Sequence, residues 1–242
     1  MVENDTNISF PSTKEKVFGR RKSKRLSFKQ KENFQHYLAK YSIFESNGDG
    51  SFDLQQIDLN SLFDKVTDFE LEIGFGMGDF LFQKALSQPN IGFLGCEVFE
   101  NGVANLVTRI KEKDLKNIFL HPGNCIGLLD NLKGLQLKSI YILFPDPWPK
   151  QKHRKRRFLT AENIDRMILA LKIGGCIYVA TDIGEYAREI SSNMNKRVDV
   201  KALSVLVEDF KAPLGNQFQT KFERKAYAQD RVPQYMVFKR IV

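Results

Sequence analysis

The chain has 242 residues, of which 42% are hydrophobic and 27% are charged. This composition is typical of a soluble globular protein, and it excludes a wholly disordered chain, a collagen and a membrane bundle. Lysine and arginine number 37 and aspartate and glutamate 29, so the formal net charge is +8 and the pI is about 9.3. Such an excess of basic residues favours a polyanionic partner, although it can also serve solubility alone.

The cysteines and the N-terminus indicate where the protein works. Cys96, Cys125 and Cys176 are isolated, and the three histidines are scattered, so no spacing typical of a zinc site occurs and we expect no metal. A sparse, odd set of cysteines fits a reducing compartment. The first ten residues do not resemble a signal peptide, and no apolar run reaches about 18 residues. We therefore expect a cytoplasmic protein, monomer or homodimer, with no membrane partner.

Residues 1–31 form a predicted flexible, basic N-terminal arm, and residues 32–242 a single domain. Residues 1–13 are polar and lack periodicity, which predicts disorder. Residues 14–31 carry nine lysines and arginines and a single acid, Glu15. This segment is either a solvated tail or an arm that lies along phosphates.

From residue 69 onward, short apolar strands alternate with helical patterns, after a first predicted helix over 33–44 and a loop over 46–51. The predicted strands are 69–75, 91–98, 117–123, 139–145, 175–182, 200–207 and 234–241. The predicted helices are 79–87, 101–113, 126–132, 160–172 and 184–196, of which 160–172 ends at a Gly174-Gly175 cap. This alternation predicts an α/β fold with a mostly parallel sheet. The last two strands have no helical pattern between them, so we expect them to pair antiparallel.

The first candidate site is the turn from Glu72 to Asp79, which follows a strand, opens a helix and contains Gly74, Gly76 and Gly78. Glycines there allow a sharp turn and close approach of the backbone to a ligand, but they also suit a plain turn. Glu97 ends the next strand, 19 residues after Gly78, where an acid binds the ribose hydroxyls of a nucleoside cofactor.

The spacing of this turn bears on the identity of the cofactor. Dinucleotide sites use G-x-G-x-x-G, whereas this chain has G-x-G-x-G preceded by Glu72. A carboxylate there repels a pyrophosphate and suits a ligand with sulfonium and ammonium groups, which favours S-adenosyl-L-methionine over NAD. Asn124, at the end of the third predicted strand, either hydrogen-bonds an adenine edge or caps a loop.

The second candidate site is FPDPWPK (144–150), which continues into a polybasic stretch. It follows the fourth predicted strand, at the sheet edge where open α/β sheets bind ligands. Three prolines stiffen the loop around Asp146 and Trp148, and six basic residues lie within 150–157. The loop is either a rigid turn with a buried tryptophan or a nucleobase pocket with phosphate clamps.

The sequence FPDPWPKQKHRKRR closely resembles the signature of the bacterial tRNA (guanine-N7)-methyltransferases of the TrmB type. ELEIGFGMG, GCEV, the pair Thr181-Asp182 and TKFE (220–223) match the same family in the same order, and the resemblance covers roughly residues 17–241. It implies a Rossmann-like class I methyltransferase fold with seven strands, S-adenosyl-L-methionine as donor, and N7 of the variable-loop guanine of tRNA, at conventional position 46, as acceptor.

The resemblance assigns roles residue by residue. It implies cofactor contacts from the acids and amide Glu72, Glu97, Asn124 and Asp146, together with the glycine turn, and it implies a catalytic role for Asp146. It implies substrate contacts from Lys150, Asp182, Thr220, Lys221, Phe222 and Glu223. The chain departs from the family at Phe99 and Asn101, where a histidine and a proline are usual, at Asn124, where an aspartate is common, and at Lys225-Ala226, which replace an Arg-Gly-like pair.

Guanine N7 carries a lone pair and no proton, so its methylation requires alignment rather than a general base. A carboxylate near the base would stabilise the positive charge that develops there, and Asp146 and Asp182 are the candidates. Either acid could instead accept from guanine N1–H and N2–H₂ or cap a helix. Three alternative functions stay open: an amino-group methylase, a nicotinamide oxidoreductase and a non-enzymatic RNA-binding module.

Overall fold

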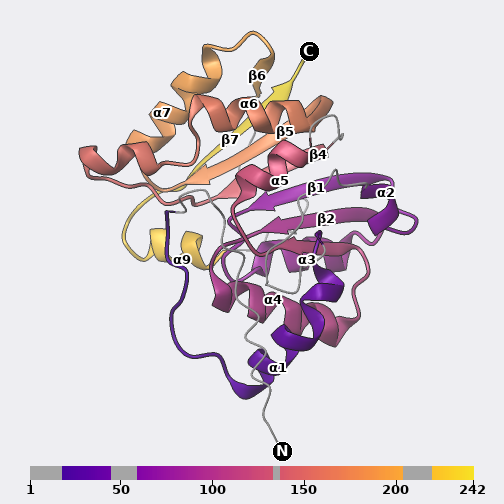
Figure 1. The fold of residues 1–242 in the computed structure, drawn as a ribbon. Helices are drawn as coiled ribbons and strands as arrows, with labels where there is room; N and C mark the ends of the chain where they lie inside the picture. The colour runs from indigo at the N-terminus through magenta and orange to yellow at the C-terminus, as the bar shows by residue number, and fades with distance from the viewer. Residues whose placement is uncertain (1–17, 45–58, 133–136, 204–219) are drawn as a thin grey trace, which may run out of the picture.

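A computed structural model of the chain describes residues 18–44, 59–132, 137–203 and 220–242. Seven strands in these ranges form one sheet in the order β3-β2-β1-β4-β5-β7-β6 (Figure 1). The strands are β1 (Asp68–Ile73), β2 (Ile91–Cys96), β3 (Ile118–His121), β4 (Leu137–Leu143), β5 (Leu171–Thr181), β6 (Val200–Leu203) and β7 (Gln234–Arg240). The predicted α/β fold is confirmed, and all seven predicted strands are present.

Helices lie on both faces of this sheet (Figure 1). The longer ones are α1 (Phe28–Tyr37), α3 (Asp79–Ser87), α4 (Glu100–Lys113), α5 (Cys125–Asn131), α6 (Ala161–Ala170), α7 (Gly184–Asn195) and α9 (Lys221–Tyr227). The short ones are α2 (Leu59–Leu62) and the 3₁₀ turns η1 (Ala39–Tyr41) and η2 (Gln151–Arg156). Apolar residues of α1, α3 and α4 form one buried cluster against the sheet, whereas those of α5, α6 and α7 belong to another.

Strand direction changes only at one side of the sheet. β1 to β5 pair in parallel, and β7 pairs antiparallel with both β5 and β6. The predicted antiparallel pairing of the last two strands is therefore confirmed. However, a helix does lie between them: α9 begins where Thr220 Oγ1 accepts a hydrogen bond from Glu223 N at 3.0 Å.

Two helices differ from the prediction at their ends. α6 ends at Ala170 and β5 begins at once, so Gly174-Gly175 is not a helix cap. The glycine pair lies in an irregular stretch of β5, where the register with β4 shifts, and an added Cβ at Gly175 would lie 2.9 to 3.0 Å from three carbonyl oxygens. The first helix starts at Phe28 rather than at residue 33, since Ser27 and Gln30 form a capping box. It ends at Tyr37 rather than at residue 44, and the 3₁₀ turn η1 follows it.

Some sequence predictions lie outside the described residues. These are the predicted disorder of residues 1–13, the loop at 46–51 and the last four residues of the predicted strand 200–207. In the basic segment the structure describes residues 18–31, and the last four of these belong to α1.

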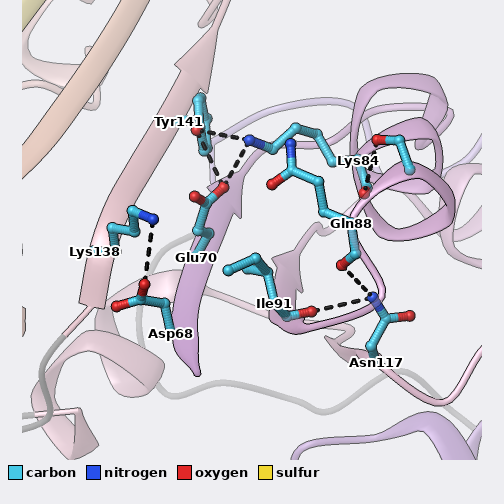
Figure 2. Close-up of polar contacts among 9 residues, drawn as sticks. Asp68, Glu70, Lys84, Gln88, Ile91, Asn117, Lys138 and Tyr141 are labelled. Atoms are coloured by element: carbon cyan, nitrogen blue, oxygen red, sulfur yellow. Dashed lines mark hydrogen bonds and ion pairs between the residues drawn. The ribbon is translucent and has the colours of Figure 1, made fainter. Parts of the chain in front are cut away.

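A buried ion pair joins the sheet to α3 below the glycine turn. Lys84 of α3 lies 2.8 Å from Glu70 Oε2 on β1 and donates a hydrogen bond to the Tyr141 hydroxyl of β4 at 3.0 Å (Figure 2). The Tyr141 hydroxyl in turn donates to Glu70 at 3.1 Å. Lys84 is 1% exposed and Glu70 4% exposed. Burial lowers the pKa of Lys84, and the Glu70 carboxylate opposes this shift.

Candidate active site

The two candidate sites meet at the point where the strand order reverses. β2 and β3 lie on one side of β1, whereas β4 and β5 lie on the other, and β1 pairs directly with β4. In open α/β sheets the crevice at the carboxyl ends of two such strands is the usual ligand site. The glycine turn follows β1 and the Asp146 loop follows β4, so both lie at the carboxyl ends of these strands, and the region between them is called the crevice from here on.

The glycine turn has a backbone that other residues rarely adopt. Gly74, Gly76 and Gly78 have φ of 74°, 56° and 76°. Helix α4 packs directly against the turn, because an added Cβ at Gly102 would lie 1.8 Å from the Gly76 carbonyl oxygen. Asn105, also on α4, donates from Nδ2 to the Met77 carbonyl at 2.9 Å. The sequence interpretation did not include these two α4 residues, because the contact joins segments that are far apart in the chain.

Glu97 fixes the glycine turn through backbone amides. Its Oε2 accepts a hydrogen bond from Gly76 N at 2.7 Å. Its Oε1 accepts from Val98 N at 2.6 Å and from Phe99 N at 2.9 Å. A carboxylate offers about four lone-pair sites, so about one is left for a ligand hydroxyl. Burial raises the pKa of Glu97, and the three amides oppose that shift.

Glu72 is a buried acid beneath the same turn. It is 3% exposed, and its Oε2 has no hydrogen-bond partner. Burial, with repulsion from Glu97 as the next cause, raises the pKa of Glu72 to about 8, whereas the Leu81 amide opposes the shift. An unsatisfied buried carboxyl oxygen beside a glycine turn fits a cationic ligand group. Together with the Glu97 carboxylate, these residues fit a nucleoside cofactor that carries positive charge.

Asn124 caps a helix in this structure. Its Oδ1 accepts a hydrogen bond from Ile126 N at 3.2 Å, at the start of α5. The sequence predicts a loop cap as the alternative role, whereas here Asn124 caps a helix; the role in adenine binding stays a prediction.

The loop after β4 has an unusual backbone around its acid. Phe144 and Trp148 have φ of 55° and 41°, a region in which residues other than glycine are strained. Phe144 N donates to the Ala180 carbonyl at 2.7 Å, which fixes the start of the loop on β5. Asp146 is solvent-exposed, yet partial burial of its carboxyl raises its pKa. The carboxylate lies close enough to Glu97 to raise the pKa of that acid as well.

The polybasic stretch divides into a buried part and an exposed part. Arg157 is 2% exposed, donates from Nε to the Pro147 carbonyl at 2.8 Å, and pairs with Glu185 and Glu189. It therefore fixes the loop to α7 and is not one of the predicted phosphate clamps. Exposed basic side chains of this stretch are Lys150, Lys152, Arg154 and Lys155.

Asp182 follows β5, the neighbour of β4, as predicted. Its carboxylate forms an ion pair with Arg231 at 2.8 Å. The cap of α7 is Ile183, which has no side-chain cap hydrogen bond, so Asp182 is not a helix cap here. Among the described residues Asp146 has no ion pair, and this difference separates the two candidate acids.

The TKFE segment packs against both parts of the crevice through one side chain. Phe222 stacks on Phe144, with ring centroids 6.4 Å apart and planes at 21°. Its Cε2 lies 3.6 Å from the position that a Cβ at Gly76 would occupy. Thr220 caps α9, whereas buried Glu223 accepts a hydrogen bond from the Tyr235 hydroxyl at 2.7 Å. Phe222 and Lys221 are exposed, so of these four residues they are the ones available to a substrate.

Two searches of the described part of the chain bear on other classes of site. No helix there is long and apolar enough to cross a membrane. No group of three or more His, Cys, Asp or Glu residues within those ranges could hold a metal ion.

Solved structures similar to this chain are methyltransferases. A 16S rRNA methyltransferase, KamB, matches with a TM-score of 0.54 at 14% identity, over 75% of this chain and 91% of that one. An antibiotic-related methyltransferase matches with a TM-score of 0.52 at 17% identity, over 78% of this chain and 98% of that one. At such identities the likeness concerns the fold alone, and the fold is that of a class I S-adenosylmethionine-dependent methyltransferase.

Sequence comparison narrows the class to a family. Residues 67–234 match a family model described as "Putative methyltransferase". A tRNA (guanine-N(7)-)-methyltransferase of Roseobacter denitrificans is 36% identical over 223 residues, which is 92% of this chain and 95% of the relative. Another, from Rhizobium meliloti, is 34% identical over 230 residues, which is 93% of this chain and 95% of the relative. The chain belongs to the tRNA (guanine-N7)-methyltransferase family, as its resemblance to the TrmB type predicts.

Proposed function

We propose that this protein transfers a methyl group from S-adenosyl-L-methionine to N7 of a guanine in tRNA. The acceptor is the variable-loop guanine at conventional position 46, and the product is 7-methylguanosine. The observation that carries the proposal is the meeting of two loops at the carboxyl ends of β1 and β4, where a glycine turn fixed by Glu97 lies near a strained loop that presents Asp146. Family membership over 92% of the chain supports the same reaction.

Three groups of the chain would hold the methyl donor. Glu97 would bind a ribose hydroxyl, Glu72 would face the ammonium group, and the turn at Gly74, Gly76 and Gly78 would admit the ligand close to the backbone. Asn124 is proposed for the adenine edge. When bound, S-adenosyl-L-methionine supplies an electrophilic methyl group on a positively charged sulfonium.

Asp146 is the acid that we propose for the chemical step. N7 has no proton to lose, so the residues around the base need to align it and to stabilise the positive charge that it acquires. Asp146 has no ion pair among the described residues, whereas Asp182 already pairs with Arg231. We therefore assign charge stabilisation to Asp146, which would also border the donor, and base recognition to Asp182.

The tRNA would lie across the basic surface beside the crevice. Lys150 and its exposed neighbours at 152, 154 and 155 extend from the Asp146 loop, and the segment 14–31 adds nine more basic residues. Lys221 and Phe222 border the crevice from α9, with Thr220 and Glu223 shaping that helix. Neutralising phosphates with such side chains makes binding strongly salt-dependent. We propose residues 1–31 as a tRNA-binding arm attached to a catalytic domain at 32–242.

The direct test is nucleoside analysis of tRNA after incubation with labelled S-adenosyl-L-methionine. The proposal expects label in 7-methylguanosine from the variable loop. Label on an exocyclic amine would instead indicate an amino-group methylase, and label at another guanine would overturn the assignment of position 46.

A separate proposal concerns location. Cys96, Cys125 and Cys176 are free thiols, which supports the reducing cytoplasm.

A further inference from the structure

Residues 18–24, called the strap from here on, run over the crevice before the first helix. In Figure 1 they belong to the indigo segment that leads from the side of the molecule carrying α9 to the start of α1. One end of the strap contacts the loop after β4, and the other end contacts the start of α4, next to the Glu97 loop. The strap therefore joins the two halves of the proposed site.

The α4 end of the strap is held by a pair of hydrogen bonds to one side chain. Asn101 Oδ1 accepts from Ser23 N at 2.9 Å, and Asn101 Nδ2 donates to the Lys24 carbonyl at 2.6 Å. Beside this pair, Glu100 N donates to the Arg21 carbonyl at 2.9 Å. α4 has no side-chain cap, so the strap carbonyl satisfies one of its free amides.

The other end of the strap lies against the loop that carries Asp146. The Phe18 ring meets Trp148 edge-on at 6.5 Å, and the Arg156 guanidinium lies over both rings, at 5.2 and 4.9 Å. Gly19 has φ of 139°, and a Cβ there would lie 3.7 Å from Asp146 Oδ2. Here the chain passes directly over the acid proposed for the chemical step.

We propose that Asn101 is a positioning residue that latches the strap across the crevice and so controls release of the used cofactor. The inference rests on the proposed function for the identity of that cofactor. With the latch closed, the strap bridges the Glu97 loop and the Asp146 loop and covers the space between them. For the product S-adenosyl-L-homocysteine to leave, the strap has to lift from Trp148.

The size of the effect follows from the two hydrogen bonds of Asn101. An ordinary hydrogen bond is worth about 2- to 10-fold in an equilibrium. Loss of both bonds should therefore shift the balance from closed to open strap by about 4- to 100-fold. The strap buries little of the core, so it can open without global unfolding.

Trp148 reports strap position directly, because it is the only tryptophan in the chain. Asn101 binds residues 23 and 24, five residues along the chain from the Phe18 contact. Asn101→Ala should therefore raise acrylamide quenching of Trp148 fluorescence from a distance, as Phe18→Ala does by direct loss of the ring. The matched control is Asn131→Ala on α5, which removes an asparagine whose Nδ2 donates to the Gly127 carbonyl of its own helix.

The second readout is the rate at which S-adenosyl-L-homocysteine dissociates, measured by displacement. We expect Asn101→Ala to accelerate dissociation by about 4- to 100-fold, with the unfolding midpoint unchanged and Asn131→Ala like the wild type. If Asn101→Ala lowers that midpoint, Ser23→Pro removes the strap-side donor and gives the same test without altering α4.

The outcomes separate this inference from the proposed function. Unchanged quenching and unchanged release in Asn101→Ala overturn the latch, even if the wild type methylates guanine N7. If the wild type methylates no tRNA but Asn101→Ala exposes Trp148 and accelerates release, the proposed acceptor is wrong and the latch stands.

Discussion

Replacing Glu72 with glutamine should stabilise the ligand-free protein at pH 8 while weakening its binding of S-adenosyl-L-homocysteine. Glu72 is fully enclosed, and burial together with repulsion from Glu97 raises its pKa from 4.5 to about 8. An acid whose pKa is higher in the folded state favours folding most at low pH. Its contribution to stability is lost as the pH rises from the pKa of the unfolded state to the pKa of the folded state.

The magnitude follows from those two pKa values. Compared with a group that does not ionise, Glu72 lowers the unfolding free energy by about 1 kcal/mol at pH 5 and about 4 kcal/mol at pH 8, because its carboxyl ionises more readily in the unfolded chain. Glutamine does not ionise. The unfolding free energy of Glu72→Gln relative to wild type should therefore rise by about 3 kcal/mol between pH 5 and pH 8.

Denaturant unfolding of both proteins at pH 5, 6.5 and 8 measures this difference, with exposed Glu162→Gln as the control. The ligand's ammonium group should favour ionised Glu72. As the pH increases toward 8, wild-type affinity for S-adenosyl-L-homocysteine should then increase by up to about tenfold per pH unit. The Glu72→Gln variant should lose that pH dependence. Parallel stability curves for wild type and Glu72→Gln would refute the reasoning, because they would mean that the carboxyl ionises as freely as in the unfolded chain.

Further changes test the other parts of the site. Glu97→Ala should weaken S-adenosyl-L-homocysteine binding by about 1–3 kcal/mol, since it removes both the ribose contact and the acceptor for the glycine turn; unchanged calorimetric affinity would remove Glu97 from the site. Asp146→Asn should lower kcat by about 10²–10³ in single-turnover assays, and a larger defect in Asp182→Asn would transfer the electrostatic role to that residue. Lys84→Met should lower the unfolding free energy by about 3–5 kcal/mol by leaving Glu70 buried and unpaired. Adding Glu70→Gln should recover much of that loss, and a double variant as unstable as the single one would contradict the ion-pair argument.

The fold was predictable because its signal repeats locally. Each parallel strand is a short apolar run and each helix an amphipathic one, so the alternation is visible without any long-range contact. The Gly174-Gly175 prediction was wrong for a physical reason. Glycine is suited both to the end of a helix and to a close approach between two backbones. Here it lies where the register between β5 and β4 shifts, and that shift depends on the partner strand. Helix α9 was missed although Thr220 and Glu223 have the spacing of a capping box.

The candidate site was predictable in its residue types and less so in its contacts. The positions of Glu97 and the glycine turn on neighbouring strands follow from the βαβ pattern. Two contacts depend on tertiary geometry. Glu97 accepts a hydrogen bond from the Gly76 amide, and Arg157 is buried against α7. In the same way Asn101 is visible in the sequence as a departure from its family, but its hydrogen bonds to the strap require the folded chain.

The acids around the crevice and on β1 differ in whether another side chain of the protein already forms an ion pair or hydrogen bond with them. Glu70 pairs with Lys84, and Asp182 with Arg231, whereas Glu223 accepts a hydrogen bond from Tyr235.

Within the described residues, Glu72 Oε2 has no hydrogen-bond partner and Asp146 has no ion pair, and burial raises the pKa of both. Two such carboxylates destabilise the free protein when they are ionised, since burial raises the pKa of each. Exposed Asp146 would also repel a phosphate backbone, so a surface that only bound RNA would gain nothing from it. A cationic donor and a base that becomes cationic give both acids a partner during the reaction, and this favours methyl transfer over a non-enzymatic RNA-binding module.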